Sequence, residues 1–159
     1  MSLFDKQSLA ILSVAHGAVL SIKNNYNLGP SFLSKVADAD LLFKEAGQQW
    51  PTKSDQGVTT WMLEKLNKWA AKERAVNGSW EVLGLAAVAM QALTDLDERV
   101  SFKARRQGGM HIEQAELLGP IFPAVQEIMD EIDPRGTRFD LYQSSDRMLK
   151  ELYSIIEWA

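Results

Sequence analysis

The densest positive charge in the chain lies in the stretch SFKARRQGGMH, which contains Lys103, Arg105 and Arg106. Such cations can bind a phosphate group or an acidic protein surface. They also suit the last turn of a helix, where they interact favourably with the free carbonyl groups. Gly108 or Gly109 would then supply the left-handed residue that ends many helices. We expect a helix end at this point and keep phosphate binding as the alternative interpretation.

A second set of cations, Lys65, Lys68 and Lys72, follows the spacing of three and four residues that places side chains on one helix face. If this face lay beside the first set, the two sets would form one basic patch for the phosphates of a nucleic acid. The whole chain carries a net charge of −4, whereas dedicated nucleic-acid-binding domains are usually basic. A solvated lysine face is therefore the preferred interpretation, and association with nucleic acid is the alternative.

Acidic residues form two pairs with helical spacing, Glu113 with Glu116 and Glu127 with Asp130. Carboxylates at positions i and i+3 share one helix face, and Mg²⁺ takes carboxylate oxygens as ligands. The pattern resembles the E-x-x-E…E-x-x-D arrangement of the all-α nucleotide pyrophosphohydrolases, the MazG-like family. This resemblance implies a Mg²⁺ site with the four side chains as ligands and a nucleoside triphosphate carried by the metal.

The segment between the two acidic pairs has ten residues and contains Gly119, Pro120 and Pro123. Two antiparallel helices that bring both pairs together need a longer connection, because proline and glycine already end the first helix within it. A solvated acidic face is therefore preferred, and we expect neither a metal ion nor another cofactor.

The two histidines, His16 and His111, lie far apart in the sequence. His16 falls among small and apolar residues of an expected helix, where a lone histidine is typical of a hydrogen-bonded position at the edge of a core. Catalysis would need a nucleophile or an acid within reach of the imidazole. The chain lacks a P-loop, a Gly-x-Ser-x-Gly elbow and the glycine pattern of a dinucleotide-binding fold. We expect structural histidines and no enzymatic activity.

The chain contains five tryptophans. Trp69 and Trp80 follow the apolar stripes of two expected helices and are predicted core residues. Trp61 points away from its stripe, Trp50 precedes a proline in a loop, and Trp158 is the penultimate residue. Tryptophan is enriched at binding hot spots, and soluble proteins seldom leave large apolar patches bare. Trp50, Trp61 and Trp158 are therefore candidate interface residues for another protein or a second copy of the chain.

Apolar residues recur at helical spacing between clusters of Asn, Gly and Pro, and no stretch alternates as a strand would. The expected helices cover residues 5–23, 31–46, 55–74, 79–104, 111–118 and 121–132, and a last one runs from a Ser144 or Ser145 cap to residue 158. Residues 80–90 are apolar on almost all sides, which indicates burial on most sides. The sequence predicts a single all-α domain over residues 1–159, a bundle of about six or seven helices around a central apolar helix at 79–104.

Hydrophobic residues make up 46% and charged residues 24% of the 159 residues, as in ordinary soluble domains. The chain has no cysteine, which excludes disulfides and a cysteine nucleophile and suits a reducing compartment. The N-terminal stretch lacks a signal-peptide cleavage site, and the apolar run 82–93 is shorter than the ~20 residues that span a bilayer. We expect a cytoplasmic protein that does not enter a membrane.

The leading functional hypothesis is a non-enzymatic protein-interaction module, namely a small accessory protein, adaptor, inhibitor or assembly factor. Its partner would be another protein or, by self-association into an oligomer, a second copy of the chain. The first alternative is a nucleic-acid-associated accessory protein that uses the two basic sets, and it predicts an affinity that falls steeply as salt rises. The second alternative is Mg²⁺-dependent nucleotide hydrolysis at the acidic pairs.

Overall fold

The computed structural model describes residues 6–48, 56–72, 78–109 and 112–154, and the regular elements within these ranges are all helices. They are α1 (Lys6–Asn25), α2 (Pro30–Gln48), α3 (Gln56–Ala70), α4 (Ser79–Arg106), α5 (Ile112–Glu116), α6 (Ile121–Ile132) and α7 (Phe139–Tyr153). The predicted all-α class is confirmed. The helix boundaries differ from the predicted ones by a few residues, and the difference is largest at α7.

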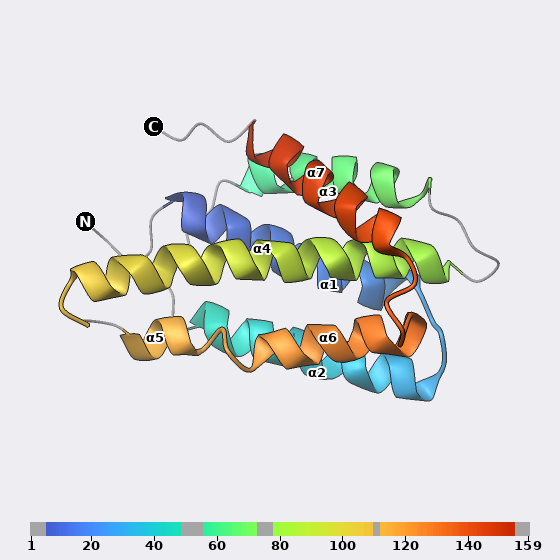
Figure 1. Cartoon of the computed structure of the whole chain (residues 1–159), viewed down its shortest axis with the longest axis horizontal. Helices are drawn as coiled ribbons and strands as arrows, with labels where there is room; N and C mark the ends of the chain where they lie inside the picture. The colour runs from blue at the N-terminus through green and yellow to red at the C-terminus, as the bar shows by residue number, and fades with distance from the viewer. Residues whose placement is uncertain (1–5, 49–55, 73–77, 110–111, 155–159) are drawn as a thin grey trace.

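The helices form three layers (Figure 1). The middle layer contains α1 and α4, which pack against each other along much of their length. On one side, α3 and α7 cover this layer, and on the other side α2, α5 and α6 cover it. Apart from α1, α4 packs against α3, α5, α6 and α7. Residues 79–104, which were expected to form the central helix, correspond to this element.

A stretch in the first half of α4 is buried around its whole circumference. All residues from Val82 to Ala89 are buried, and only then does the helix become amphipathic, with Leu93, Leu96 and Val100 turned inward. This change agrees with the sequence, in which the apolar residues surround the helix first and later follow one stripe. Within the described ranges, no helix combines enough length and apolar character to cross a membrane.

Two glycines let α3 approach the middle layer closely. A Cβ atom added at Gly84 of α4 would lie 3.2 Å from the Trp69 ring, and one added at Gly17 of α1 would lie 2.6 Å from the Leu63 side chain. The Trp69 indole also donates a hydrogen bond from Nε1 to Ser144 Oγ of α7 at 3.2 Å. Because glycine has no Cβ, Leu63 packs directly on the backbone of α1 at Gly17, and Trp69 packs directly on the backbone of α4 at Gly84.

A buried carboxylate joins α1 to α2. Asp40 of α2 is buried, and Nε2 of His16 in α1 donates to its Oδ1 at 2.7 Å. Lys23 and Lys44 contact Asp40 Oδ2 at 2.9 and 3.1 Å. Burial alone would raise the pKa of Asp40, but the hydrogen bonds outweigh burial and hold this pKa well below its usual range. His16 also stacks on Phe43, with 5.1 Å between ring centroids, so it is a hydrogen-bonded residue at the edge of the core.

The last helix begins earlier than predicted, at Phe139. Ser144 and Ser145 lie inside α7, and the buried Ser145 hydroxyl donates to the carbonyl of Tyr142 at 2.7 Å. The prediction of a serine N-cap is therefore wrong. A side-chain hydroxyl within a helix can bond to the preceding turn as readily as it can cap an end, so its presence does not mark the boundary.

Asp133 organises the loop before α7 instead. Its buried carboxylate accepts hydrogen bonds from the backbone N–H and the hydroxyl of Thr137, at 2.8 and 2.6 Å. The backbone N–H of Arg138 and the Tyr142 hydroxyl also donate to it, at 3.1 and 3.4 Å. Burial works to raise the pKa of Asp133, and these donors lower it below its ordinary value. Asp133 thus supplies a side-chain acceptor for the backbone N–H groups just before α7, whereas Ser144 or Ser145 was expected to cap the helix.

Candidate functional site

Trp61 lies on the outer side of α3 and is 44% exposed. Lys65, one turn later, places Nζ 5.5 Å from the centroid of the Trp61 ring, which is a cation–π contact. The same Nζ lies 3.0 Å from Oε1 of Glu151 in α7. The two contacts hold Lys65 between the indole and α7, so the exposed tryptophan belongs to a surface that two helices share.

Lys68 and Lys72 continue this surface to the end of α3 and just beyond it. Both side chains are exposed, and neither forms an ion pair with a residue in the described part of the chain. Glu64 is an exposed acid at the edge of the same surface. We call Trp61, Lys65, Lys68 and Lys72 the Trp61 face. It combines a large apolar ring with three cations, of which Lys65 is paired with Glu151, whereas Lys68 and Lys72 form no ion pair with a described residue.

Of the three predicted interface tryptophans, Trp61 is the one that falls within the described residues. Trp50 and Trp158 lie outside them. Trp69 and Trp80, which were predicted to be core residues, are partly buried and pack against the hydrophobic core.

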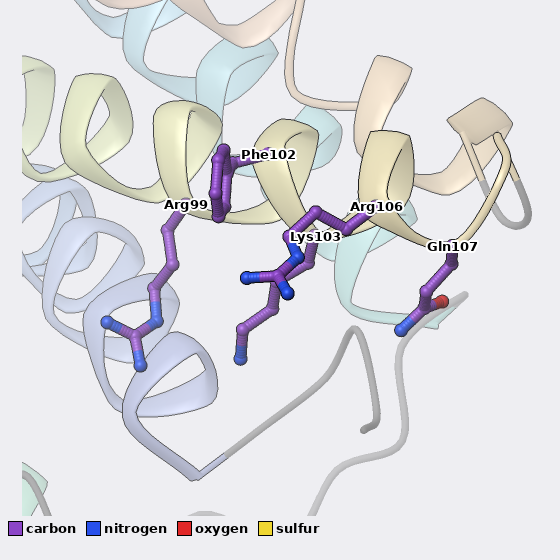
Figure 2. Close-up of a pocket in the computed structure, with 5 residues that line it drawn as sticks. All are labelled: Arg99, Phe102, Lys103, Arg106 and Gln107. Carbon is purple, nitrogen blue, oxygen red and sulfur yellow. The ribbon is translucent and has the colours of Figure 1, made fainter.

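The other basic set surrounds Phe102 at the C-terminal end of α4. Phe102 is 53% exposed. Figure 2 shows that Arg99, Lys103 and Arg106 extend from the same side of the helix, with Gln107 beside them. The guanidinium carbon of Arg106 lies 5.7 Å from the centroid of the Phe102 ring. Among the described residues, these side chains line a hollow of about 440 Å³, which we call the Phe102 hollow.

The charges in this region agree with the predicted helix end. Lys103, Arg105 and Arg106 all lie in the last turn of α4, where cations stabilise the helix dipole. Burial lowers the pKa of Lys103, since a partly desolvated ammonium group loses favourable hydration. Arg105 and Arg106 are exposed and form no ion pair with any of the described residues. The region therefore carries net positive charge as well as ending the helix.

Acidic residues lie on the far side of Phe102. Asp95 and Glu98, together with Arg99, Phe102 and Arg105, line a second, more open hollow of about 490 Å³. Burial raises the pKa of Asp95, against the opposing effect of a hydrogen bond with Tyr153. The positive region is thus bounded on one side, and it does not extend around α4.

The predicted glycine cap at the end of α4 is confirmed. Gly108 and Gly109 both have positive φ, at 72° and 84°. The Gly109 N–H donates to the carbonyl of Ala104 at 2.9 Å, and the Gly108 N–H donates to the carbonyl of Arg105 at 3.1 Å. This pair of bonds is the Schellman motif, which satisfies the last carbonyl groups of a helix.

The two basic sets do not form one patch. Trp69 of α3 packs on Gly84 near the start of α4, whereas Lys103 belongs to the last turn of α4. The nineteen residues that separate Gly84 from Lys103 correspond to about 30 Å of helix. Lys68 and Lys72, which are close in sequence to Trp69, therefore lie toward the start of α4, and Lys103 lies at its other end. The two ends of α4 lie at opposite ends of the molecule (Figure 1).

The acidic pairs do not form a metal site in the part of the chain that the structure describes. There, no group of three or more carboxylate or imidazole side chains lies close enough to hold a metal ion. Glu113 and Glu116 belong to α5, and Glu127 and Asp130 belong to α6, which follows α5 along α4 instead of lying beside it (Figure 1). All four side chains are exposed. His111 lies outside the described residues.

Sequence reasoning missed Phe102, Arg99 and Asp40. Phe102 stands between Ser101 and Lys103, in a stretch whose charges drew attention to the helix end. A helical wheel would have placed it with Arg99 and Arg106, at spacings of three and four. Asp40 is buried in a helix whose other acidic residues are exposed. Its burial depends on His16 and Lys23 of α1, and spacing along α2 does not reveal these partners.

A comparison with protein-family models gives no match, and neither curated proteins nor solved structures give a significant match. The functional argument therefore rests on the residues of this chain.

Proposed function

We propose that this protein is a non-enzymatic interaction module and that the Trp61 face is the surface with which it binds a partner protein. The observation that carries the proposal is the exposure of Trp61 next to cations of the same helix. Tryptophan is the residue type most typical of binding hot spots, because one rigid side chain buries a large apolar area. Such a module would act as a small accessory protein, adaptor, inhibitor or assembly factor.

The charges of the face indicate the chemistry of the partner. Lys68 and Lys72 have no ion-pair partner among the described residues, so an acidic segment would complement them. An apolar side chain in the same segment would cover the Trp61 ring. Lys65 is already held by Glu151, so this part of the face is ordered before binding and loses little side-chain entropy. The partner we propose is therefore an acidic protein segment with an apolar anchor, encountered in the cytoplasm.

The test compares proteins captured from native host lysate by the wild type and by variants, identified by mass spectrometry. Trp61→Ala removes the anchor, and Lys68→Glu combined with Lys72→Glu reverses the charge without touching the core. Leu41→Ala is the matched control, because Leu41 is 56% exposed on α2, in the opposite layer. We expect a protein that the wild type and the control capture after nuclease treatment and that both face variants lose.

Two outcomes contradict the proposal. If the face variants capture the same proteins as the wild type, binding uses another surface. If every captured protein disappears after nuclease treatment, association with nucleic acid replaces protein binding as the function. Size-exclusion chromatography of the same variants reports self-association, since an oligomer that Trp61→Ala dissociates would identify the partner as a second copy.

A further inference from the structure

A second exposed apolar surface lies on α2, in the layer opposite to α3. Leu33 and Leu41 are 37% and 56% exposed, and the exposed Ala37 lies midway between them. These three residues are four positions apart, so they form one stripe along the exposed side of α2. Because the alanine side chain is much smaller than that of leucine, the stripe is lower at its centre than at its two ends.

Acidic side chains accompany this stripe. Asp38 and Glu45 lie one turn before and one turn after Leu41. Both are exposed, and neither forms an ion pair with a residue in the described ranges. Lys44, a cation of the same helix, is bound to Asp40 at 3.1 Å. The Leu41 face, as we call this surface, consists of Leu33, Ala37, Asp38, Leu41 and Glu45.

The Leu41 face has the chemistry that the Trp61 face requires of a partner. Lys68 and Lys72 are exposed cations that form no ion pair with the described residues, and Asp38 and Glu45 are exposed anions in the same situation. Opposite charges of this kind attract two surfaces and fix their relative orientation. The leucines of the stripe supply the apolar contact that an exposed tryptophan ring needs to become a binding hot spot.

The two faces also agree in spacing along their helices. Lys68 follows Trp61 by seven residues, which is about 10 Å of helix. Glu45 follows Ala37 by eight residues, which is about 12 Å. When the two helices run in the same direction, the Trp61 ring can contact Ala37 between the two leucines. In this register Lys68 lies within reach of Glu45.

We propose that the Trp61 face binds the Leu41 face of a second copy of this chain. The inference rests on the proposed function, because it takes the Trp61 face as a binding surface and identifies an acidic segment that fits it. A partner protein with the same chemistry would compete with the second copy for Trp61.

The arrangement of the layers determines what such a contact builds. Helices α2 and α3 cover opposite sides of the middle layer (Figure 1). A copy that receives a neighbour on α3 therefore still presents its own α2 to another copy. A contact between two different surfaces of one chain is head-to-tail, and it builds rings or open chains of copies instead of a symmetric pair.

Sedimentation velocity of the purified full chain over a series of concentrations tests the proposal. We expect the wild type to form dimers and then larger species as the concentration rises. Trp61→Ala and Leu41→Lys should each raise the dissociation constant at least about tenfold. Phe139→Ala is the matched control, because Phe139 is a 67% exposed aromatic residue that belongs to neither face, and this variant should associate like the wild type.

A mixture of the two defective variants distinguishes head-to-tail contact from other arrangements. Trp61→Ala keeps an intact Leu41 face, and Leu41→Lys keeps an intact Trp61 face. Mixed in equal amounts, the two variants should form a one-to-one dimer and no larger species, because each supplies the surface that the other lacks. Both positions are exposed, so the changes leave the core intact, and circular dichroism checks the fold.

Charge reversal tests the proposed register. Lys68→Glu alone should weaken association, since it places two acids opposite each other. Adding Glu45→Lys to the same chain should restore association, because the two charges are then exchanged across the contact. Equal affinity of the single and the double variant would overturn the pairing of Lys68 with Glu45.

Three results would overturn the head-to-tail contact. The first is a wild type that stays monomeric up to about 1 mM, the weak end of specific association. The second is an oligomer that either defective variant leaves intact. The third is a mixture of the two variants that stays monomeric.

Failure of this inference can be told apart from failure of the proposed function. Leu41 variants keep the Trp61 face, so they should still capture a partner protein from lysate. A chain that captures a partner through Trp61 and stays monomeric would overturn this inference alone.

Discussion

Asp40 Oδ1 lies 2.7 Å from His16 Nε2, and this contact crosses from α2 to α1 inside a largely apolar interface. Lys23 and Lys44 bind the second oxygen of the same carboxylate, so one buried charge has three donors. A buried carboxylate is tolerated only when such donors compensate its lost hydration. The pairing therefore helps to fix how α2 sits on the middle layer.

Asp40→Asn should destabilise the protein by about 1–3 kcal/mol at pH 7, since hydrogen bonds to a charged acceptor are worth more than those to an amide. The partly exposed positions of His16, Lys23 and Lys44 keep the loss at the lower end of what a buried pair costs. Urea unfolding followed by circular dichroism measures this difference. A free energy of unfolding equal to that of the wild type would show that the carboxylate charge contributes nothing.

The stability difference between the wild type and Asp40→Asn should depend on pH. The folded-state pKa of Asp40 is below its unfolded-state value, so its contribution to stability is fully present above the unfolded pKa, near ~4. It is lost as the pH falls from there through the folded-state pKa. The gap in unfolding free energy between the wild type and Asp40→Asn should therefore be smaller at pH 3 than at pH 7. A gap that stays constant would contradict the lowered pKa.

Gly84→Ala should destabilise the protein by about 1 kcal/mol. The new methyl group would lie 3.2 Å from the Trp69 ring, which its hydrogen bond to Ser144 holds in place. Crowding of this kind costs about 1–3 kcal/mol, and the better helix propensity of alanine returns about 1 kcal/mol. Gly47→Ala is the control, because nothing lies within 4 Å of its added Cβ, and it should stabilise α2 by about 0.5 kcal/mol. Thermal unfolding of both variants should thus shift in opposite directions.

Asp133→Ala should cost about 2–4 kcal/mol, because it leaves the backbone donors of Thr137 and Arg138 without their acceptor in a partly buried loop. Asp140→Ala, a change of an exposed carboxylate in the same region, should cost much less. Chemical unfolding compares the two. If both variants lose the same stability, Asp133 does not organise the start of α7.

Gly108→Ala should destabilise the end of α4 by about 1 kcal/mol, because a side chain at φ 72° meets the steric penalty of the left-handed region. Hydrogen exchange should report faster opening of the last turn of α4 and unchanged protection in its buried first half. Unchanged exchange in the last turn would show that the cap does not hold the helix end.

Much of the fold could be predicted from patterns along the chain. The apolar run from Trp80 to Met90 indicated a helix buried on most sides, and the Gly108-Gly109 pair marked where it ends. These features are local, so periodicity and glycine chemistry report them directly. The start of α7 was misplaced because Asp133 accepts from residues up to nine positions later, and its burial depends on how the loop packs.

The candidate sites were less predictable than the fold. Trp61 could be singled out because it breaks the stripe of its own helix, and it is exposed. The separation of Lys68 and Lys72 from Lys103 could not be predicted, because it depends on the directions in which α3 and α4 run relative to each other. The Phe102 hollow could not be predicted either, because it depends on how the last turns of α4 lie against the start of α1, which is a property of packing and not of spacing.

The close packing of α3 on Gly17 and Gly84 has a consequence for the kinetics of recognition. Leu63 packs on Gly17, and Trp69 packs on Gly84. These two contacts fix the position of α3 on the middle layer, and they lie on either side of Lys65 in the sequence. A helix held in this way cannot slide or rotate without lifting both side chains out together. A partner of the kind we propose should therefore meet Trp61 on a helix of fixed position and should not wait for a rare arrangement of the free protein. Complex formation should follow a single phase whose rate rises linearly with partner concentration, in the manner of two rigid bodies.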